Sequence, residues 1–152
     1  MRRTATILAV VALMVTLSSG AALAAFGDSI TGTDHTDIFT GTKWAERIFG
    51  LGGADQINGG GPDLVEGGQG SDELADGLGK DTVYGNSGRD NLIGQGGATS
   101  LDYFYGGGGN DLVQPVDVPI VKDVVSCGRG TDTVYADEAD VVNDNCERVR
   151  TR

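Results

Sequence analysis

Acidic side chains recur at a nearly constant spacing along most of this chain, and they are the residues best suited to do chemistry. The pattern is clearest in Gly67–Ala75, Gly85–Ile93 and Gly106–Gln114, where the sixth residue is acidic and the eighth is apolar. Two copies are one residue short, 59–66 and 136–143, and two others carry insertions, at 98–101 and around 115–122. The register places thirteen acids at position six: Asp37, Glu46, Asp55, Asp63, Asp72, Asp81, Asp90, Asp102, Asp111, Asp123, Asp132, Asp140 and Glu147.

The chemistry open to these acids is the binding of a hard cation. Calcium accepts about six to eight oxygen ligands from carboxylates and backbone carbonyls, in flexible geometry. Magnesium demands a stricter octahedron, which a flexible glycine-rich turn does not favour. Zinc and copper prefer histidine or thiolate ligands, and His35 is the only histidine. The acids therefore predict calcium as the cofactor.

The apolar residue at position eight indicates the element that positions each acid. A three-residue strand such as Glu73-Leu74-Ala75 can direct one side chain inward, and Leu74 is the apolar candidate. The equivalent residues are Phe39, Ile48, Ile57, Val65, Leu74, Val83, Leu92, Phe104, Val113, Val125, Val134, Val142 and Val149. The glycines before each acid allow positive φ and leave room for carbonyls to converge on an ion. We therefore expect an all-β fold of about thirteen nine-residue repeats.

The copies match the nonapeptide G-G-x-G-x-D-x-U-x, where U is a large apolar residue. In this the chain resembles the repeats-in-toxin, or haemolysin-type, calcium-binding family. The resemblance implies a parallel β-roll or β-solenoid with calcium held between stacked turns. The acids that it implies as ligands are Asp55, Asp63, Asp72, Asp81, Asp90, Asp111 and Asp132. The turn glycines implied with them are Gly67, Gly68, Gly70, Gly85, Gly88, Gly106, Gly107 and Gly109.

If two repeats complete one coil, the acids form two stacks of turns. One stack would hold Asp55, Asp72, Asp90 and Asp111, and the other Asp63, Asp81 and Asp102. Adjacent rungs lie about 4.8 Å apart. At this distance two like charges repel each other by roughly 1 kcal/mol in water, and by more at a lower dielectric. One buried Val or Leu per repeat yields about 1.5–3 kcal/mol, whereas ordering the backbone costs about 1–2 kcal/mol per residue. We therefore expect folding to require calcium.

The pattern weakens at both ends, which divides the mature chain into three parts. Residues 25–49 form a lead-in with degenerate capping repeats, in which Trp44 or Phe49 is expected to cover the first rung. Residues 50–114 are the calcium-binding repeats, and residues 115–152 are degenerate repeats with a C-terminal cap. Cys127 and Cys146 are the only cysteines, and they fall in turns two repeats apart. In a secreted chain this predicts a disulfide that stabilises the cap.

Residues 1–24 have the features of a cleaved signal peptide. Arg2 and Arg3 precede an apolar run over 7–17, and Ala22-Leu23-Ala24 supplies small residues before the expected cleavage after Ala24. The alternative is an uncleaved membrane anchor, but the run is short for a bilayer span. The sequence therefore predicts a secreted, extracellular protein that does not insert into a membrane once the signal is removed.

Charge and residue content exclude several classes of function. The chain carries 11 Lys and Arg against 22 Asp and Glu; without residues 1–24 it carries 9 against 22, a net charge of −13. Such a charge argues against nucleic acid as a partner. With one histidine and with acids that the repeat already accounts for, we expect no enzyme activity.

The function expected is calcium binding by a secreted monomer, as a calcium-stabilised structural or adhesion module with an unidentified cell-surface or matrix partner. Two alternatives remain open. One is a ligand-binding β-roll such as an ice-binding protein, although the threonines are scattered rather than arranged in a regular ladder. The other is a non-catalytic accessory subunit of a secreted enzyme or toxin.

Overall fold

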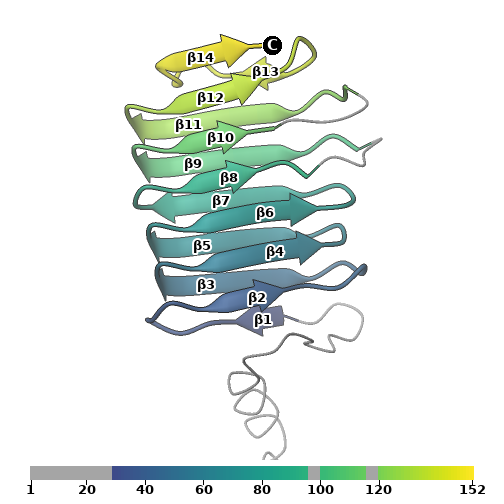
Figure 1. Cartoon of the computed structure of the whole chain (residues 1–152), viewed down its shortest axis with the longest axis vertical. Coiled ribbons are helices and arrows are strands. Elements are labelled where there is room, and N and C mark those ends of the chain that lie inside the picture. The colour runs from purple at the N-terminus through teal and green to yellow at the C-terminus, as the bar shows by residue number, and fades with distance from the viewer. Residues whose placement is uncertain (1–28, 96–99, 116–119) are drawn as a thin grey trace, which may run out of the picture.

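The computed structural model describes residues 29–95, 100–115 and 120–152, which form a β-solenoid (Figure 1). The signal peptide predicted over 1–24 lies outside these residues. The odd-numbered strands form one seven-stranded sheet, called sheet A: β1 (Ser29–Thr31), β3 (Arg47–Gly53), β5 (Leu64–Gly70), β7 (Thr82–Ser87), β9 (Tyr103–Gly109), β11 (Val124–Gly130) and β13 (Val141–Val142). The even-numbered strands form the second, sheet B: β2 (Ile38–Thr40), β4 (Gln56–Gly60), β6 (Glu73–Gly77), β8 (Asn91–Ile93), β10 (Leu112–Gln114), β12 (Thr133–Ala136) and β14 (Arg148–Thr151).

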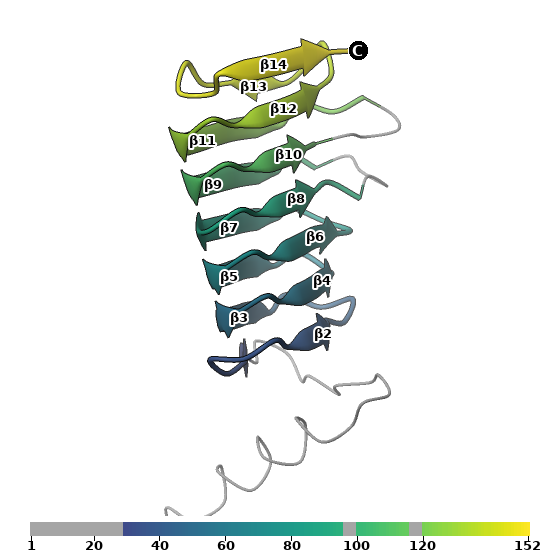
Figure 2. The ribbon, with the colours of Figure 1, turned by 60° about the vertical axis from the view of Figure 1, so that its left-hand side comes forward.

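Two consecutive strands complete one coil, as predicted, so that each strand pairs in parallel with the strand two places further along the chain. Figure 2 shows the two sheets lying against each other along the length of the solenoid. The register keeps position eight aligned from rung to rung: in sheet A, Ile48 pairs with Val65, which pairs with Val83. Because side chains alternate along a strand, this alignment directs every position-eight residue to the same face of its sheet.

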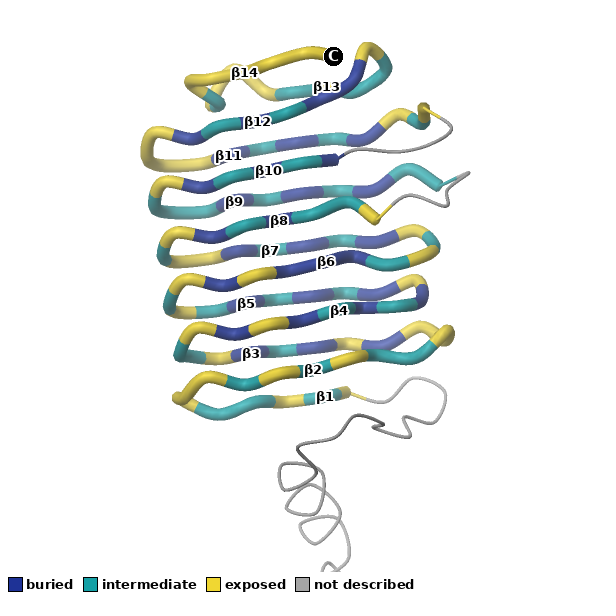
Figure 3. Tube along the Cα trace, in the orientation of Figure 1, coloured by how far each residue is buried: buried dark blue, intermediate teal, exposed yellow. Residues whose placement is uncertain are grey.

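The core is a double column of these aligned residues between the sheets. Ten of them are buried: Ile48, Ile57, Val65, Leu74, Val83, Leu92, Phe104, Val113, Val125 and Val134. Buried segments recur in each of the middle rungs of Figure 3, and exposed residues mark the turn tips and β14. Val149 was expected to point into this core, but it is 45% exposed. It pairs with Val134 in the last described rung, where no further described strand covers it.

The first rung differs from the expectation in two ways. The repeat pattern begins at position 32, yet β1 precedes it and pairs with β3, so the described chain has fourteen strands rather than about thirteen. Trp44 is 41% exposed and lies in the turn before β3, and Phe49 faces outward from β3, so neither covers the first rung. Ile30 and Phe39 pack against the core there instead.

The turns fall on two edges of the solenoid that differ in regularity. We call regular edge the set of turns from sheet A to sheet B, on the left of Figure 1, which carry Asp37, Asp55, Asp72, Asp90, Asp111, Asp132 and Glu147. We call irregular edge the set of turns from sheet B to sheet A, on the right, which carry Glu46, Asp63, Asp81, Asp102, Asp123 and Asp140. Both short copies and both insertions of the repeat lie on the irregular edge. The two predicted stacks of acids are therefore confirmed.

The predicted disulfide is present at the C-terminal end. Cys127 and Cys146 are bonded with their Cα atoms 5.1 Å apart, inside the range of about 4.4–6.8 Å that a disulfide requires. Cys127 is buried and Cys146 packs against the core. The bond thus ties β11 to the segment before β14, where the turn glycines fade. No helix among the described residues has the length and apolar character to cross a membrane.

Candidate metal centre

The acids of the regular edge are joined by a ladder of hydrogen bonds that runs along the solenoid. The backbone N–H of Asp55 donates to Oδ1 of Asp72 at 2.9 Å, and that of Asp72 donates to Oδ1 of Asp90 at 3.0 Å. The ladder continues from Asp90 to Asp111 at 2.9 Å and from Asp111 to Asp132 at 2.8 Å. Each carboxylate is therefore held by the rung before it, with one of its two oxygens committed to the backbone.

In five acids of this edge the second carboxylate oxygen has no hydrogen-bond partner. The Oδ2 atoms concerned are buried, and on the regular edge they belong to Asp55, Asp72, Asp90, Asp111 and Asp132. A buried carboxylate oxygen without a donor costs considerable free energy, and such groups are normally paired or bound to metal. Five of them in line on one edge of the fold thus indicate a bound cation.

The glycine at position one leaves the space into which these oxygens point. A Cβ built on Gly85 would lie 2.6 Å from Oδ2 of Asp90 and 2.6 Å from the carbonyl oxygen of Gly106. At Gly106 the same atom would lie 2.7 Å from Oδ2 of Asp111 and 2.6 Å from the carbonyl oxygen of Cys127. In both turns a carboxylate from one rung and a carbonyl from the next face the same space, and calcium prefers these two oxygen ligands.

The glycine at position four allows the turns to stack at all. Gly109 has a φ of 147°, and a Cβ on it would overlap the carbonyl oxygen of Gly88 in the neighbouring rung. Gly70, Gly88 and Gly130 stand in the same relation to the rung below them. Gly68 and Gly107, at position two, also have positive φ and close backbone contacts. The turn glycines picked out by the sequence are therefore needed for backbone approach and for the space around the acids.

The irregular edge has the same ladder but different partners for the second oxygen. The backbone N–H of Asp63 donates to Oδ1 of Asp81, and the backbone N–H of Asp81 donates to Oδ1 of Asp102 at 2.7 Å. Oδ2 of Asp63 accepts a 3.3 Å hydrogen bond from the N–H of Gly61, whereas Oδ2 of Asp81 is buried without a partner. Of the two irregular-edge acids among the predicted ligands, Asp81 therefore has the stronger need for a cation.

Threonine satisfies the acids of the first two turns. Oδ2 of Asp37 accepts from the N–H of Thr33 at 2.7 Å and from its hydroxyl at 2.9 Å. Glu46 accepts in the same way from the N–H and the hydroxyl of Thr42. These two turns lack the full set of glycines. Their acids accept hydrogen bonds from threonine, whereas in the later turns of the regular edge the corresponding Oδ2 atom has no donor.

Burial and like-charged neighbours shift these carboxyl groups toward the neutral form. Burial raises the pKa of Asp81 to about 8, and the carboxylates of Asp76 and Asp102 add to the effect. Burial likewise raises the pKa of Asp90 to about 7 and that of Asp63 to about 6, against the opposing effect of the backbone donors. The pKa values of Asp55, Asp72, Asp111 and Asp132 are raised for the same reason. A bound cation would reverse this shift by favouring the charged form.

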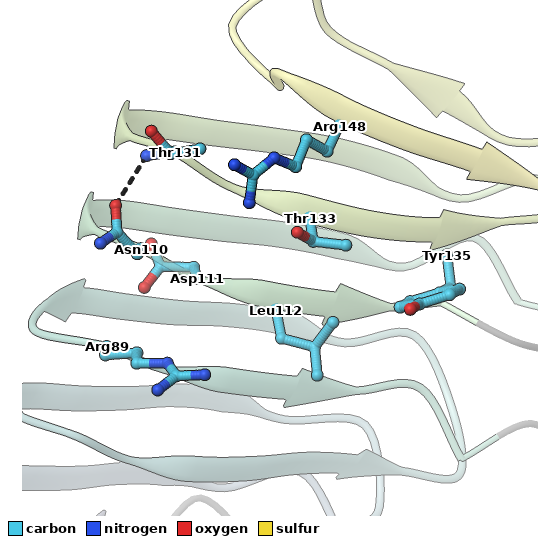
Figure 4. A pocket seen from close by; sticks show the side chains of 8 residues that line it. All are labelled: Arg89, Asn110, Asp111, Leu112, Thr131, Thr133, Tyr135 and Arg148. Atoms are coloured by element: carbon cyan, nitrogen blue, oxygen red, sulfur yellow. Dashed lines mark hydrogen bonds between the residues drawn. The ribbon is translucent and has the colours of Figure 1, made fainter.

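A shallow groove lies beside the regular edge on the outer face of sheet B (Figure 4). Its lining side chains come from the turns and from β10, β12 and β14, and the N–H of Thr131 donates to Oδ1 of Asn110 at 2.8 Å. Arg89 and Arg148 reach into it, but its lining includes no histidine, serine or cysteine.

Fold and site together define a parallel β-solenoid whose stacked turns present carboxylate and carbonyl oxygens to a hard cation. A family model, the RTX calcium-binding nonapeptide repeat, matches the chain in four copies over residues 31–63, 41–74, 66–101 and 77–113. The matched residues make up more than half of the chain, which belongs to this family and has calcium as its ligand. Searches of the curated proteins and of the solved structures gave no match.

Proposed function

We propose that the protein is a secreted, calcium-stabilised structural or adhesion module without enzyme activity, in which calcium holds the solenoid together outside the cell. The observation that carries the proposal is the row of partnerless Oδ2 atoms of Asp55, Asp72, Asp90, Asp111 and Asp132. Calcium between adjacent rungs would satisfy these atoms and offset the repulsion between their charges. Stability would then follow the calcium concentration, because metal binding supplies folding free energy.

Secretion is supported by the leader-like residues 1–24 and by the disulfide between Cys127 and Cys146. Disulfides persist in oxidising compartments. Extracellular calcium modules bind calcium with dissociation constants of about 10⁻⁴–10⁻³ M, which suit the calcium concentration outside the cell. A chain that folds only at such concentrations would stay unfolded in the calcium-poor interior of the cell and fold once exported. The net charge of −11 also fits a role that involves cations rather than nucleic acid.

The decisive experiment is a circular dichroism titration of the purified protein with calcium, starting from a chelated sample. The expected result is little β signal in chelator and a cooperative gain at sub-millimolar to millimolar calcium, with magnesium much less effective. An unchanged spectrum in excess chelator, together with no calcium retained in equilibrium dialysis, would show instead a hydrophobic solenoid whose acids serve only solubility.

A further inference from the structure

One turn of the irregular edge carries an acid where the repeat calls for glycine. Asp76 occupies position one of the copy 76–84, at the end of β6, and it is 2% exposed. In the turns with glycine at this position, a Cβ would point at Oδ2 of the acid five residues later, as Gly85 does toward Asp90. A carboxylate at position one is therefore directed at the ion-binding face of its own turn.

Asp76 lies together with two acids of the irregular edge. One carboxylate oxygen each from Asp76, Asp81 and Asp102 lies within 4.8 Å of the other two, and all three residues are buried. They come from neighbouring rungs, since Asp81 precedes β7 and Asp102 precedes β9 (Figure 1). Three carboxylates at this separation inside a protein repel one another strongly unless a cation lies between them.

Two independent features show that this cluster is arranged for a ligand. Oδ2 of Asp81 is buried without a hydrogen-bond partner, and Asp81 itself is 0% exposed. Oδ1 of Asp76 accepts hydrogen bonds from the N–H groups of Gly77 and Gln95, both at 2.6 Å. The backbone thus fixes Asp76 in place, and this preorganisation is what a selective metal site requires.

We infer that Asp76, Asp81 and Asp102 form a three-carboxylate calcium site that the nonapeptide pattern does not provide, and that this site fills before those of the regular edge. The inference rests on the proposed calcium-dependent function. The regular-edge turns of Asp55, Asp72, Asp90 and Asp111 have glycine at position one and present one partnerless carboxylate oxygen each. The extra charge of Asp76 raises the affinity of this one site, since calcium affinity increases with the number of charged ligands.

The test is calorimetric titration of the full chain with calcium, comparing the wild type with Asp76→Gly and Asp76→Asn. Asp76→Gly restores the repeat consensus and removes both the charge and the acceptor for the two N–H groups. Asp76→Asn keeps an oxygen for the N–H groups of Gly77 and Gln95 and removes only the charge. Glu73→Gln is the matched control, because it removes one exposed charge from the outer face of sheet B.

We expect a first binding phase in the wild type and in Glu73→Gln that is tighter than the rest, and its loss in both Asp76 variants. The affinity of that one site should fall by a factor on the order of ten, with the later phase retained. Identical isotherms in wild type and both Asp76 variants would overturn the inference and leave the proposed function intact. Loss of the tight phase in Asp76→Gly alone would also overturn it, by assigning Asp76 a packing role. A wild type that binds no calcium would instead refute the proposed function.

Discussion

The backbone N–H of Asp72 donates a 3.0 Å hydrogen bond to Oδ1 of Asp90, one rung further along the regular edge, while Oδ2 of both residues stays without a partner. The two oxygens of each carboxylate therefore have separate tasks. Oδ1 fixes the distance between rungs, and Oδ2 remains available to a cation. Each acid inside the ladder takes part in two such relationships, one with the rung before it and one with the rung after.

This double role predicts the effect of removing one charge from the middle of the ladder. Asp72→Asn keeps an acceptor for the N–H of Asp55 but weakens the binding of the ions on both sides of the rung. The number of calcium ions bound at saturation should therefore fall. Asp140→Asn is the control on the irregular edge, because both carboxylate oxygens of Asp140 accept backbone N–H groups, from Asp123 and Asp137. Equilibrium dialysis should show wild-type stoichiometry for Asp140→Asn. Equal stoichiometry in both variants would contradict the assignment of ions to the regular edge.

Neighbouring glycines in one turn should respond very differently to the same substitution. In Gly109→Ala the new Cβ meets the carbonyl oxygen of Gly88 at a φ of 147°, which the backbone can relieve only by separating the rungs. The cost should be about 3 kcal/mol or more. In Gly108→Ala the nearest atom is the carbonyl oxygen of Asn86 at 3.9 Å, so stability should change by less than about 1 kcal/mol. Thermal unfolding in saturating calcium measures both, and similar losses would disprove the stacking argument.

The position of the acids and of the core could be predicted from the sequence, because an acid and an apolar residue two places apart define both the turn and the inward direction. The difference between the two edges could not. Asp63 and Asp81 occupy the same position in the repeat, and only the fold reveals that Gly61 supplies a donor to Asp63 while Asp81 has none for Oδ2. β1 was missed because Ser29-Ile30-Thr31 has a single apolar residue and no glycine-rich turn before it.

Acidification should affect the metal-free and the calcium-bound protein in opposite ways. Burial raises the pKa of Asp81 to about 8 and that of Asp90 to about 7, above the value of about 3.9 in an unfolded chain. A raised folded-state pKa favours folding where the group is protonated, and this contribution is lost as the pH rises through the folded pKa. In chelator, the folded fraction of the protein should therefore be higher near about pH 5 than near about pH 8.

With calcium the sign reverses, because the ion binds the ionised carboxylate and competes with protons. The calcium concentration needed for half-maximal folding should rise as the pH falls from about 8 to about 5. The β signal measured by circular dichroism in chelator at each pH, and calcium titrations at the same pH values, test both statements. A chelated protein that loses stability on acidification would contradict the assignment of these buried carboxyl groups.

The disulfide should stabilise the C-terminal end even when calcium is saturating. The bond between Cys127 and Cys146 spans 19 residues, and closing a loop of that size contributes about 3 kcal/mol in the chain-entropy account. The double variant Cys127→Ser, Cys146→Ser should lower the melting temperature in calcium, and amide exchange should increase mainly in β11 to β14. Two alkylatable thiols in the native protein would show that the bond does not form.

If residues 1–24 are a signal peptide, as their sequence predicts, the mature protein has a defined N-terminus. Cleavage after Ala24 gives a chain that begins at Ala25, close before the first described strand at Ser29. N-terminal sequencing of protein from the culture medium should return Ala25. Recovery of Met1 or Arg2 from the medium would rule out this processing, and export would then need another explanation.

The unequal edges also determine how the molecule can change its size. Between Asp55 and Asp132, every departure from the nine-residue period lies on the irregular edge, so the regular edge maintains one pitch over this part of the solenoid. Loops on the irregular edge can therefore lengthen or shorten without disturbing the spacing of the rungs. Duplication of a whole coil, by contrast, lengthens the solenoid by about 4.8 Å and adds one further calcium-binding position between rungs of the regular edge. Length and ion capacity thus increase together, and the protein can serve as a spacer whose reach is set by the number of its repeats.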